Sequence, residues 1–293
     1  MDILSFDIEE WYIEETLHGG RPDRYAAYDR YLDGILDLLD EQRIQATFFI
    51  VGKMASTYPN VLRRIDERGH DIGCHSNSHK WLNKMTRDEV YEDTRQAVDA
   101  LEQCLGKKVK SYRAPAFSIG KENQWAFEEL VHCGIENDAS IFPAARDFGG
   151  FPEFGDQVPT VISTPSGIIR EFPIVMARLL NRDIAFSGGG YFRFFPLWFV
   201  KSQMKKRDFN ISYFHIGDLI PSDNKMMTKE EYEDYFKEPG TLLNRYKRYL
   251  KSNLGKATAL NKMNDLIRSR RFISIAQASE QIDWEMVPKW VIE

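Results

Sequence analysis

Two histidines four residues apart, His75 and His79, are the side chains of this sequence whose type and spacing first suggest metal chemistry. They lie in the run 71–79, in which an apolar-alternating stretch ends at His75 and the second histidine follows four residues later. If one helical turn follows the strand, the two imidazoles project from one face, about 5–6 Å apart at Cβ, and can share a divalent ion. A surface turn could hold the same pair, so residues elsewhere must decide between these interpretations.

Other ionisable side chains also follow predicted strands. They are Asp7, Glu9 and Glu10 after the first strand, Arg113 after the fourth, and His215 after a late one. In barrel-like α/β folds, active sites are built where the carboxyl ends of the strands meet. Two histidines and one carboxylate are a familiar ligand set for zinc or a similar divalent ion, and a second carboxylate beside the ion could serve as general base.

Strands and helices alternate along the first half of the chain. Periodicity predicts strands over 3–7, 47–51, 71–75 and 111–113, and helices over 25–41, 59–68, 86–105 and 122–133. The continuously apolar strand at 47–51 is typical of a parallel sheet that is covered on both faces. This alternation predicts a parallel sheet or barrel.

The second half of the chain is less regular. Residues 143–165 are rich in Gly, Pro, Phe and acidic side chains, which indicates a long surface excursion whose aromatic rings need burial. Beyond it we expect strands at 167–174, 209–215 and 272–275, a helix at 196–207, and mainly helical structure over 229–271. No second domain boundary is evident, so we predict one domain over 1–293.

Composition excludes several function classes. Charged residues make up 28% of the chain and the net charge is −5, so nucleic acid is not an expected partner. We find no signal-peptide pattern and no apolar run long enough to span a bilayer, which favours a cytoplasmic protein without a transmembrane segment. The three cysteines, in a spacing unlike that of disulfides, agree with a reducing compartment.

Four motifs together resemble the polysaccharide deacetylase family, the NodB-homology proteins of carbohydrate esterase family 4. They are Phe6-Asp7-Ile8-Glu9-Glu10-Trp11, His75-Ser76-Asn77-Ser78-His79, Tyr112-Arg113-Ala114-Pro115-Ala116-Phe117 and Tyr213-Phe214-His215. The resemblance is greatest to the exopolysaccharide-associated branch, which the segments 141–143 and 186–193 also resemble. It covers about the first three quarters of the chain, and we recognise nothing beyond about residue 220.

This resemblance implies a distorted (β/α) barrel of about seven strands. We expect a core over about 1–220 and a helical C-terminal extension over about 225–293. The resemblance also implies a metal held by His75 and His79, with Asp7 as general base. The family commonly has a carboxylate directly after the base as third ligand, but Ile8 occupies that position here. Glu9 is therefore the expected third ligand, and Glu10 the alternative.

The remaining roles also follow from the resemblance. His215 would protonate the leaving amine, Arg113 would pair with Asp7 and keep that carboxylate ionised, and Asp138 is the candidate for orienting His215. The backbone N–H of Ala116 would stabilise the oxyanion, together with the metal. The aromatic candidates for stacking on a sugar are Trp11, Phe117 and Tyr191.

The function implied is metal-dependent removal of an N-acetyl group from an amino sugar of a polysaccharide or glycan precursor, such as a lipid- or nucleotide-linked sugar. Zinc is the expected ion, although cobalt, nickel and iron suit the same ligands. Two alternatives are a hydrolase of non-sugar amides, such as a deformylase or cyclic amide hydrolase, and an inactive glycan-binding module. Retention of the catalytic residues argues against the inactive module, and the sequence leaves the oligomeric state open.

Overall fold

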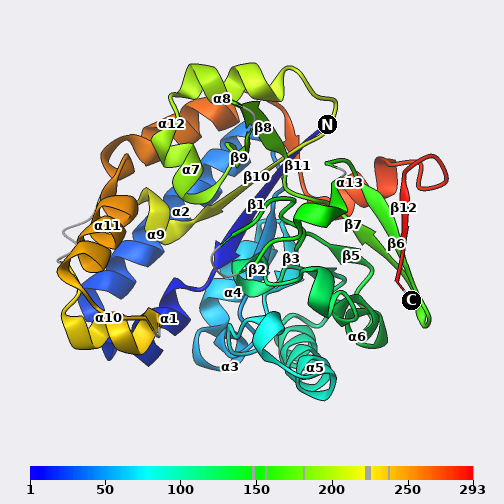
Figure 1. The fold of residues 1–293 in the computed structure, drawn as a ribbon, viewed down its shortest axis with the longest axis horizontal. Helices are drawn as coiled ribbons and strands as arrows, with labels where there is room; N and C mark the ends of the chain where they lie inside the picture. The colour runs from blue at the N-terminus through cyan, green and yellow to red at the C-terminus, as the bar shows by residue number, and fades with distance from the viewer. Residues whose placement is uncertain (147–148, 156, 181, 222–225, 237, 293) are drawn as a thin grey trace.

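A central sheet, enclosed by helices, organises the protein in the computed structural model (Figure 1). The structure describes residues 1–146, 149–155, 157–180, 182–221, 226–236 and 238–292. The strands are β1 (Asp2–Ile8), β2 (Thr47–Ile50), β3 (Asp71–Cys74), β4 (Ser111–Tyr112), β5 (Asn137–Asp138), β6 (Thr160–Thr164), β7 (Gly167–Glu171), β8 (Met176–Leu179), β9 (Arg182–Ala185), β10 (Asn210–His215), β11 (Phe272–Ile273) and β12 (Lys289–Val291).

The sheet contains a run of seven parallel neighbours in the order β10-β1-β2-β3-β4-β5-β7. Beyond β7 it continues through antiparallel β6 to β12, and the short β11 pairs with the start of β1. Strands β8 and β9 form a separate hairpin. The predicted distorted (β/α) barrel of about seven strands is confirmed. It is open between β10 and β7, because no pairing within the described ranges joins these two strands.

Helices occupy most of the connections between the strands. They are α1 (Glu10–His18), α2 (Pro22–Gln42), α3 (Met54–Thr57), α4 (Pro59–Glu67), α5 (Arg87–Leu105), α6 (Ala126–His132), α7 (Gly189–Phe194), α8 (Leu197–Met204), α9 (Ile216–Leu219), α10 (Lys229–Phe236), α11 (Leu242–Asn253), α12 (Lys256–Ser269) and α13 (Ile275–Gln281), with 3₁₀ turns η1 (Leu82–Lys84), η2 (Pro115–Phe117), η3 (Lys121–Asn123) and η4 (Pro152–Phe154). The helices in the described part of the chain are too short or too polar to cross a membrane.

Local sequence explains the best-defined elements. Helix α5 begins at a capping box between Thr86 and Glu89 and ends at Gly106 in a left-handed conformation. Strands β1 and β2 are buried at every position, as expected for a sheet covered on both faces. Between β2 and β3, a Cβ at Gly73 would lie 2.5 Å from Cδ1 of Phe49, so the strand that leads to His75 requires glycine there.

The C-terminal residues are helical, and they also complete the core. Helix α12 buries an apolar stripe, and β11 then pairs with β1. The predicted strand at 272–275 ends at Ile273, because Ser274 forms a capping box that starts α13. The next backbone N–H, of Ile275, donates to Thr47 on β2. The division into a core and an extension stays a prediction, but α12 packs against helices α2, α7, α8 and α9, and α13 packs against strands β1 and β5.

Candidate active site

Parallel pairing of β1 with β10 places the predicted base beside the predicted acid. Asp7 and His215 are register partners at the ends of these two strands. Glu9 follows directly after β1 and precedes α1. Asp7 is only 2% exposed, so its carboxylate is removed from bulk water. Sheet pairing therefore brings together residues that are more than 200 positions apart in the sequence.

The adjoining strands β3 and β4 deliver the next pair. Cys74 and Tyr112 are register partners, so His75 and Arg113 follow at the same level of the sheet. Nδ1 of His75 lies 2.7 Å from the carbonyl oxygen of Arg113. A hydrogen bond from Nδ1–H to that carbonyl leaves Nε2 as the nitrogen with a free lone pair.

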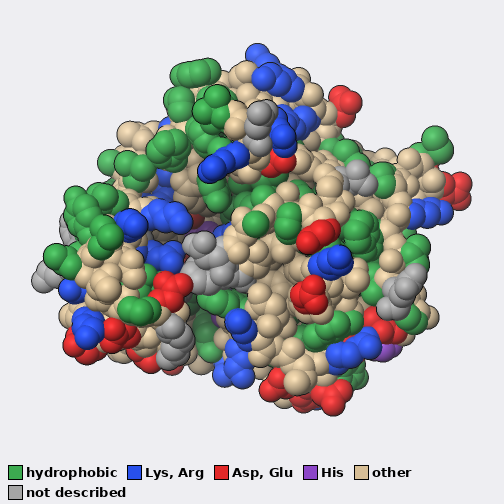
Figure 2. Space-filling model, in the orientation of Figure 1, with side chains coloured by type: hydrophobic (Ala, Val, Ile, Leu, Met, Phe, Trp, Pro, Cys, Tyr) green, Lys and Arg blue, Asp and Glu red, His purple; other side chains and the backbone are tan. Residues whose placement is uncertain are grey.

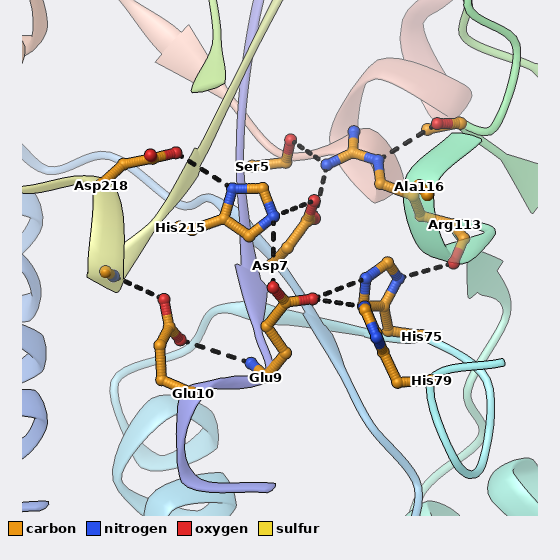
Figure 3. A network of polar contacts seen from close by, with 12 residues as sticks. Ser5, Asp7, Glu9, Glu10, His75, His79, Arg113, Ala116, His215 and Asp218 are labelled. Atoms are coloured by element: carbon orange, nitrogen blue, oxygen red, sulfur yellow. Dashed lines mark hydrogen bonds and ion pairs between the residues drawn. The ribbon is translucent and has the colours of Figure 1, made fainter. Parts of the chain in front are cut away.

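Three predicted metal ligands converge at this rim (Figure 3). Oε2 of Glu9 lies 2.5 Å from Nε2 of His79 and 3.5 Å from Nε2 of His75. One ligand atom from each residue can be chosen such that all lie within 4.8 Å of one another. Because the bond from His75 to the Arg113 carbonyl directs Nε2 inward, this donor set fits a divalent ion.

The condition of a helical turn between the two histidines is not met. Residues 75–80 form a loop, in which Ser76 and His79 have positive φ values of 63° and 55°. Asp93 on α5 holds this loop by accepting hydrogen bonds from Ser76 Oγ at 2.7 Å and from the backbone N–H of Asn77 at 2.8 Å. The histidines therefore approach each other through loop geometry fixed by a neighbouring helix.

Glu10 is directed away from the histidines. Its Oε1 accepts a hydrogen bond of 2.6 Å from the backbone N–H of Gly217, while Glu9 faces His75 and His79 (Figure 3). Burial, together with the charge of Glu9, raises the pKa of Glu10 to about 7. Burial also acts to raise the pKa of Glu9, but the charges of the nearby histidines outweigh it and lower that pKa well below its usual value. This arrangement supports Glu9 as the third ligand.

Arg113 is fully buried and fixes the predicted base. Its Nη1 donates to Oδ1 of Asp7 at 2.7 Å and to Ser5 Oγ at 2.9 Å, and its Nε donates to the Ala139 carbonyl at 3.1 Å. The ion pair compensates two charges that would otherwise be costly to bury. The arrangement leaves the second carboxylate oxygen of Asp7 directed toward His215, at 3.6 Å from Nε2.

Asp218, and not Asp138, is the carboxylate beside His215. Nδ1 of His215 lies 3.2 Å from Oδ2 of Asp218, which in turn lies near Arg193. The expectation for Asp138 is wrong, because β5 lies between β4 and β7 and places this side chain against Ser140, whose Oγ donates to it at 2.7 Å. The spacing His215 to Asp218, one turn of α9, was the sequence signal for the true neighbour.

Carboxylates also determine the protonation of His215. Burial acts to lower its pKa, but the charges of Glu9 and Asp7 and the hydrogen bond with Asp218 outweigh burial and raise the pKa well above its usual value. These carboxylates therefore favour the protonated form of the His215 ring.

The turn proposed to bind the oxyanion is conformationally unusual. Ala116 and Phe117 have φ values of 55° and 54°, a region that non-glycine residues rarely adopt. Together with Ser76 and His79, they make up four of the six non-glycine residues with positive φ in the described part of the chain. Such strained residues often accompany functional sites.

Two of the three aromatic candidates do not offer a stacking surface. Trp11 is buried in the core against Tyr28, with ring centroids 5.5 Å apart, and Phe117 is buried against Tyr213. The predictions of sugar stacking for Trp11 and Phe117 are therefore contradicted, since both rings fill the core. Tyr191 is 38% exposed and remains accessible.

An open groove of about 1050 Å³ starts at His79 and could receive an extended substrate. It is lined by residues of the loops after β3, β4 and β5 and by residues at and just after the end of α10, among them Trp81, Lys121, Arg146 and Glu238. A second groove, of about 720 Å³, begins at Glu10 and runs between α1 and α11. The rim residues thus lie beside two grooves in which the C-terminal helices form part of the wall.

Comparison with known proteins identifies two matching regions. Residues 23–135 match the polysaccharide deacetylase family model, and residues 139–280 match a domain of unknown function, DUF3473. A peptidoglycan-N-acetylglucosamine deacetylase of Bacillus cereus is 38% identical over 97 residues, 32% of this chain and 35% of that protein. A chitooligosaccharide deacetylase of Sinorhizobium fredii is 31% identical over 102 residues, 33% of this chain and 47% of that protein.

Solved structures share the fold over the whole chain. A candidate polysaccharide deacetylase of Mycobacterium smegmatis has a TM-score of 0.64 at 17% identity, over 100% of this chain and 93% of that one. A carbohydrate esterase family 4 pseudoenzyme of Bacillus anthracis has a TM-score of 0.51 at 12% identity, over 100% of this chain and 69% of that one. At these identities the similarity shows the fold alone.

Proposed function

Because this chain carries a polysaccharide deacetylase domain of the NodB-homology type, carbohydrate esterase family 4, we propose that it is a metal-dependent hydrolase that removes an N-acetyl group from an amino sugar. The convergence of Glu9, His75 and His79 beside the pairs Asp7–Arg113 and His215–Asp218 carries this proposal. One rim thus combines a metal-ligand set with a base and an acid.

The proposed ligands are Glu9, His75 and His79. A divalent ion held by them would act as a Lewis acid toward the amide carbonyl and would make water more acidic. Zinc suits this ligand set, as do cobalt, nickel and iron. The exact ion stays a prediction.

The other residues supply proton transfer and orientation. Asp7 accepts a proton from the attacking water, while Arg113 fixes the position of its carboxylate and balances the charge. The Ala116 backbone N–H is proposed to stabilise the oxyanion that develops on the former carbonyl oxygen. His215 then donates a proton to the amine nitrogen as the C–N bond breaks. Asp218 orients the imidazole through Nδ1.

The relatives and the shape of the site support the substrate class that we propose. The two relatives named above are a peptidoglycan-N-acetylglucosamine deacetylase and a chitooligosaccharide deacetylase, and the groove beside His79 is open rather than enclosed. We propose an N-acetylated polysaccharide or glycan precursor, with Tyr191 as the candidate stacking residue. The cytoplasmic location and the lipid- or nucleotide-linked form of the precursor stay predictions.

Metal removal tests the mechanism. A chelator should abolish acetate release from N-acetylglucosamine oligosaccharides, and zinc or cobalt should restore it. Asp7→Asn should release no acetate but still bind zinc in equilibrium dialysis, because the ligands are intact. Acetate release that is indifferent to chelation would overturn the metal mechanism.

The same assay separates the alternatives. A hydrolase of non-sugar amides should leave the oligosaccharides intact and cleave formylated amines or cyclic amides, with the same dependence on Asp7. An inactive glycan-binding module should bind the oligosaccharide and release acetate from none of these compounds. Either result would contradict the proposed sugar deacetylase.

A further inference from the structure

Helix α11 presents its leucines to solvent, while several of its polar residues line a groove of the protein. Leu243, Tyr246, Leu250 and Leu254 follow one another at helical spacing, from α11 to the residue after it, and all are exposed. On the opposite side, Arg245 and other polar side chains line the groove of about 720 Å³. A helix that packs on a globular core normally has the reverse arrangement.

A second exposed apolar segment continues this stripe. Phe194 lies on α7 and Trp198 on α8, and both helices contact α12, which follows α11 in the chain. Helix α7 also contacts α11 directly, because Nη2 of Arg193 donates to the Lys251 carbonyl, and a Cβ on Gly255 would lie 2.2 Å from the Arg193 carbonyl oxygen. We call the six side chains the apolar face: Phe194, Trp198, Leu243, Tyr246, Leu250 and Leu254, each between 48% and 72% exposed.

Basic residues accompany the apolar face. The segments 184–207 and 239–264 contain eleven Lys and Arg residues, and all 44 acidic residues lie elsewhere in the chain. Lys205 and Lys247 are among the exposed ones. Figure 2 shows hydrophobic side chains over α8, α12 and α11 with blue basic side chains beside them. This separation of charge contrasts with the net charge of −5.

We propose that the apolar face binds the surface of a lipid bilayer that contains anionic lipids. Exposed Leu and Phe can enter the acyl boundary, Trp and Tyr favour the interface, and Lys and Arg attract anionic head groups. A symmetric dimer through the same face is disfavoured, because it would place the basic segments of the two copies against each other. A bilayer with anionic lipids can contact both the apolar and the basic side chains of this surface.

This face is connected to the candidate active site. Arg193, whose neighbour Phe194 is exposed, lies 3.3 Å from Asp218, the residue beside His215. Bilayer binding would therefore place the side of the site that carries His215 close to the lipid surface. Binding of the apolar face to a bilayer would not depend on the proposed hydrolase activity.

Vesicle flotation tests the proposal with the full chain. At low salt the protein should float with vesicles of phosphatidylcholine and phosphatidylglycerol in equal parts, and much less with phosphatidylcholine alone. Leu243→Ser with Leu250→Ser should weaken binding at least tenfold. Lys205→Gln with Lys247→Gln should weaken it on the order of thirtyfold, given the usual contribution of two basic residues near an anionic surface.

Matched controls replace exposed residues away from the apolar face. Ile168→Ser with Met286→Ser, and Lys289→Gln, should leave vesicle binding unchanged. Brominated lipids should quench tryptophan fluorescence in the parent but much less in Trp198→Phe. Asp7→Asn should bind vesicles like the parent, so failure of the proposed activity would not affect this test.

Three results would overturn the proposal. The first is that the protein does not bind anionic vesicles at low salt. The second is that the remote control variants lose as much vesicle binding as the variants of the apolar face. The third is that vesicle binding is absent and sedimentation velocity shows a concentration-dependent dimer that the α11 variants abolish. The last result would identify a second copy of the chain as the occupant. Because the residues substituted on the apolar face and in the remote controls are exposed, the unfolding midpoints of these variants in urea should stay close to that of the parent.

Discussion

At the scale of single residues, the pairing of each catalytic candidate with a charged partner is the most informative feature. Arg113 holds Asp7, and Asp218 contacts Nδ1 of His215. A general base or acid is useful only if its position is fixed within hydrogen-bonding reach of the reacting atoms. Substitutions of these partner residues can therefore test the site in the same way as substitutions of the catalytic groups.

Asp218→Asn should reduce kcat by about 10- to 100-fold and change KM little, because Asp218 orients His215 and does not line the groove beside His79. Steady-state kinetics of acetate release measure this split. Asp138→Asn is the comparison: its effect should appear in the urea unfolding midpoint, because Asp138 binds Ser140 within the fold. A larger kcat effect from Asp138→Asn than from Asp218→Asn would contradict the assignment.

The Asp7–Arg113 pair should show strong coupling in stability. Arg113→Gln leaves the Asp7 carboxylate buried without its cation, which should cost about 3 kcal/mol in the free energy of unfolding. Asp7→Asn with Arg113→Gln removes both charges and should recover more than half of that loss. Urea denaturation of the parent, the two single variants and the double variant provides a double-mutant cycle. Simple additivity of the two single variants would refute the coupling.

At the scale of elements, loops decide more of the site than helices do. The periodicity predicted α2 and α5 well, because each has a long apolar stripe and α5 has clear capping signals. The histidine loop is different: its shape comes from bonds to Asp93 on α5. Helix α1 and the β8–β9 hairpin were not predicted, because short elements leave a weak periodic signal.

His70, at the junction of α4 and β3, should make stability depend on pH. The ring is buried, its Nδ1 accepts from the Ala46 backbone N–H, and burial lowers its pKa to about 4. Below about pH 6.5 the unfolded chain binds a proton that the folded chain does not, so the free energy of unfolding falls as the pH falls toward 4. This contribution should reach about 2 kcal/mol between pH 7 and pH 5.

Urea denaturation at pH 7 and pH 5 checks this value. His70→Gln keeps a hydrogen-bond acceptor but removes the titrating ring, so its loss of stability between the two pH values should be smaller than that of the parent by about this amount. His18→Gln, at an exposed position, serves as the control and should follow the parent. An unchanged pH dependence in His70→Gln would exclude this residue as the source.

At the scale of the whole molecule, the two ends of the chain meet in one sheet. Strand β11 pairs with β1, and α12 and α13 bury apolar residues beside it. The regions that match the two family models, 23–135 and 139–280, both contribute strands to this sheet. The C-terminal residues are thus part of the core as well as the wall of the grooves.

A chain ended after Pro221 should fail to fold cooperatively, because it lacks α12, β11 and α13 and exposes the apolar surface that they cover. Circular dichroism during urea denaturation should show no sharp transition. A chain that lacks only residues 287–293 loses the edge strand β12 and should still unfold cooperatively at a lower urea concentration. A sharp transition in the shorter chain would show an independent core.

The sequence by itself determined the fold class and the residues of the rim. Alternating periodicity predicts a parallel array, and the motifs around Asp7, His75, Arg113 and His215 stand at strand ends, where parallel pairing must bring them together. These features are local, so they can be read from short segments.

Tertiary structure alone decided which carboxylates face which partners. The sequence favoured Glu9 over Glu10 as the third ligand, and the turn after β1 directs Glu9 to the histidines and Glu10 to Gly217. It favoured Asp138 for His215, but strand order places Asp138 away and α9 supplies Asp218. Side-chain direction and burial depend on contacts between distant segments, which is also why Trp11 and Phe117 fill the core.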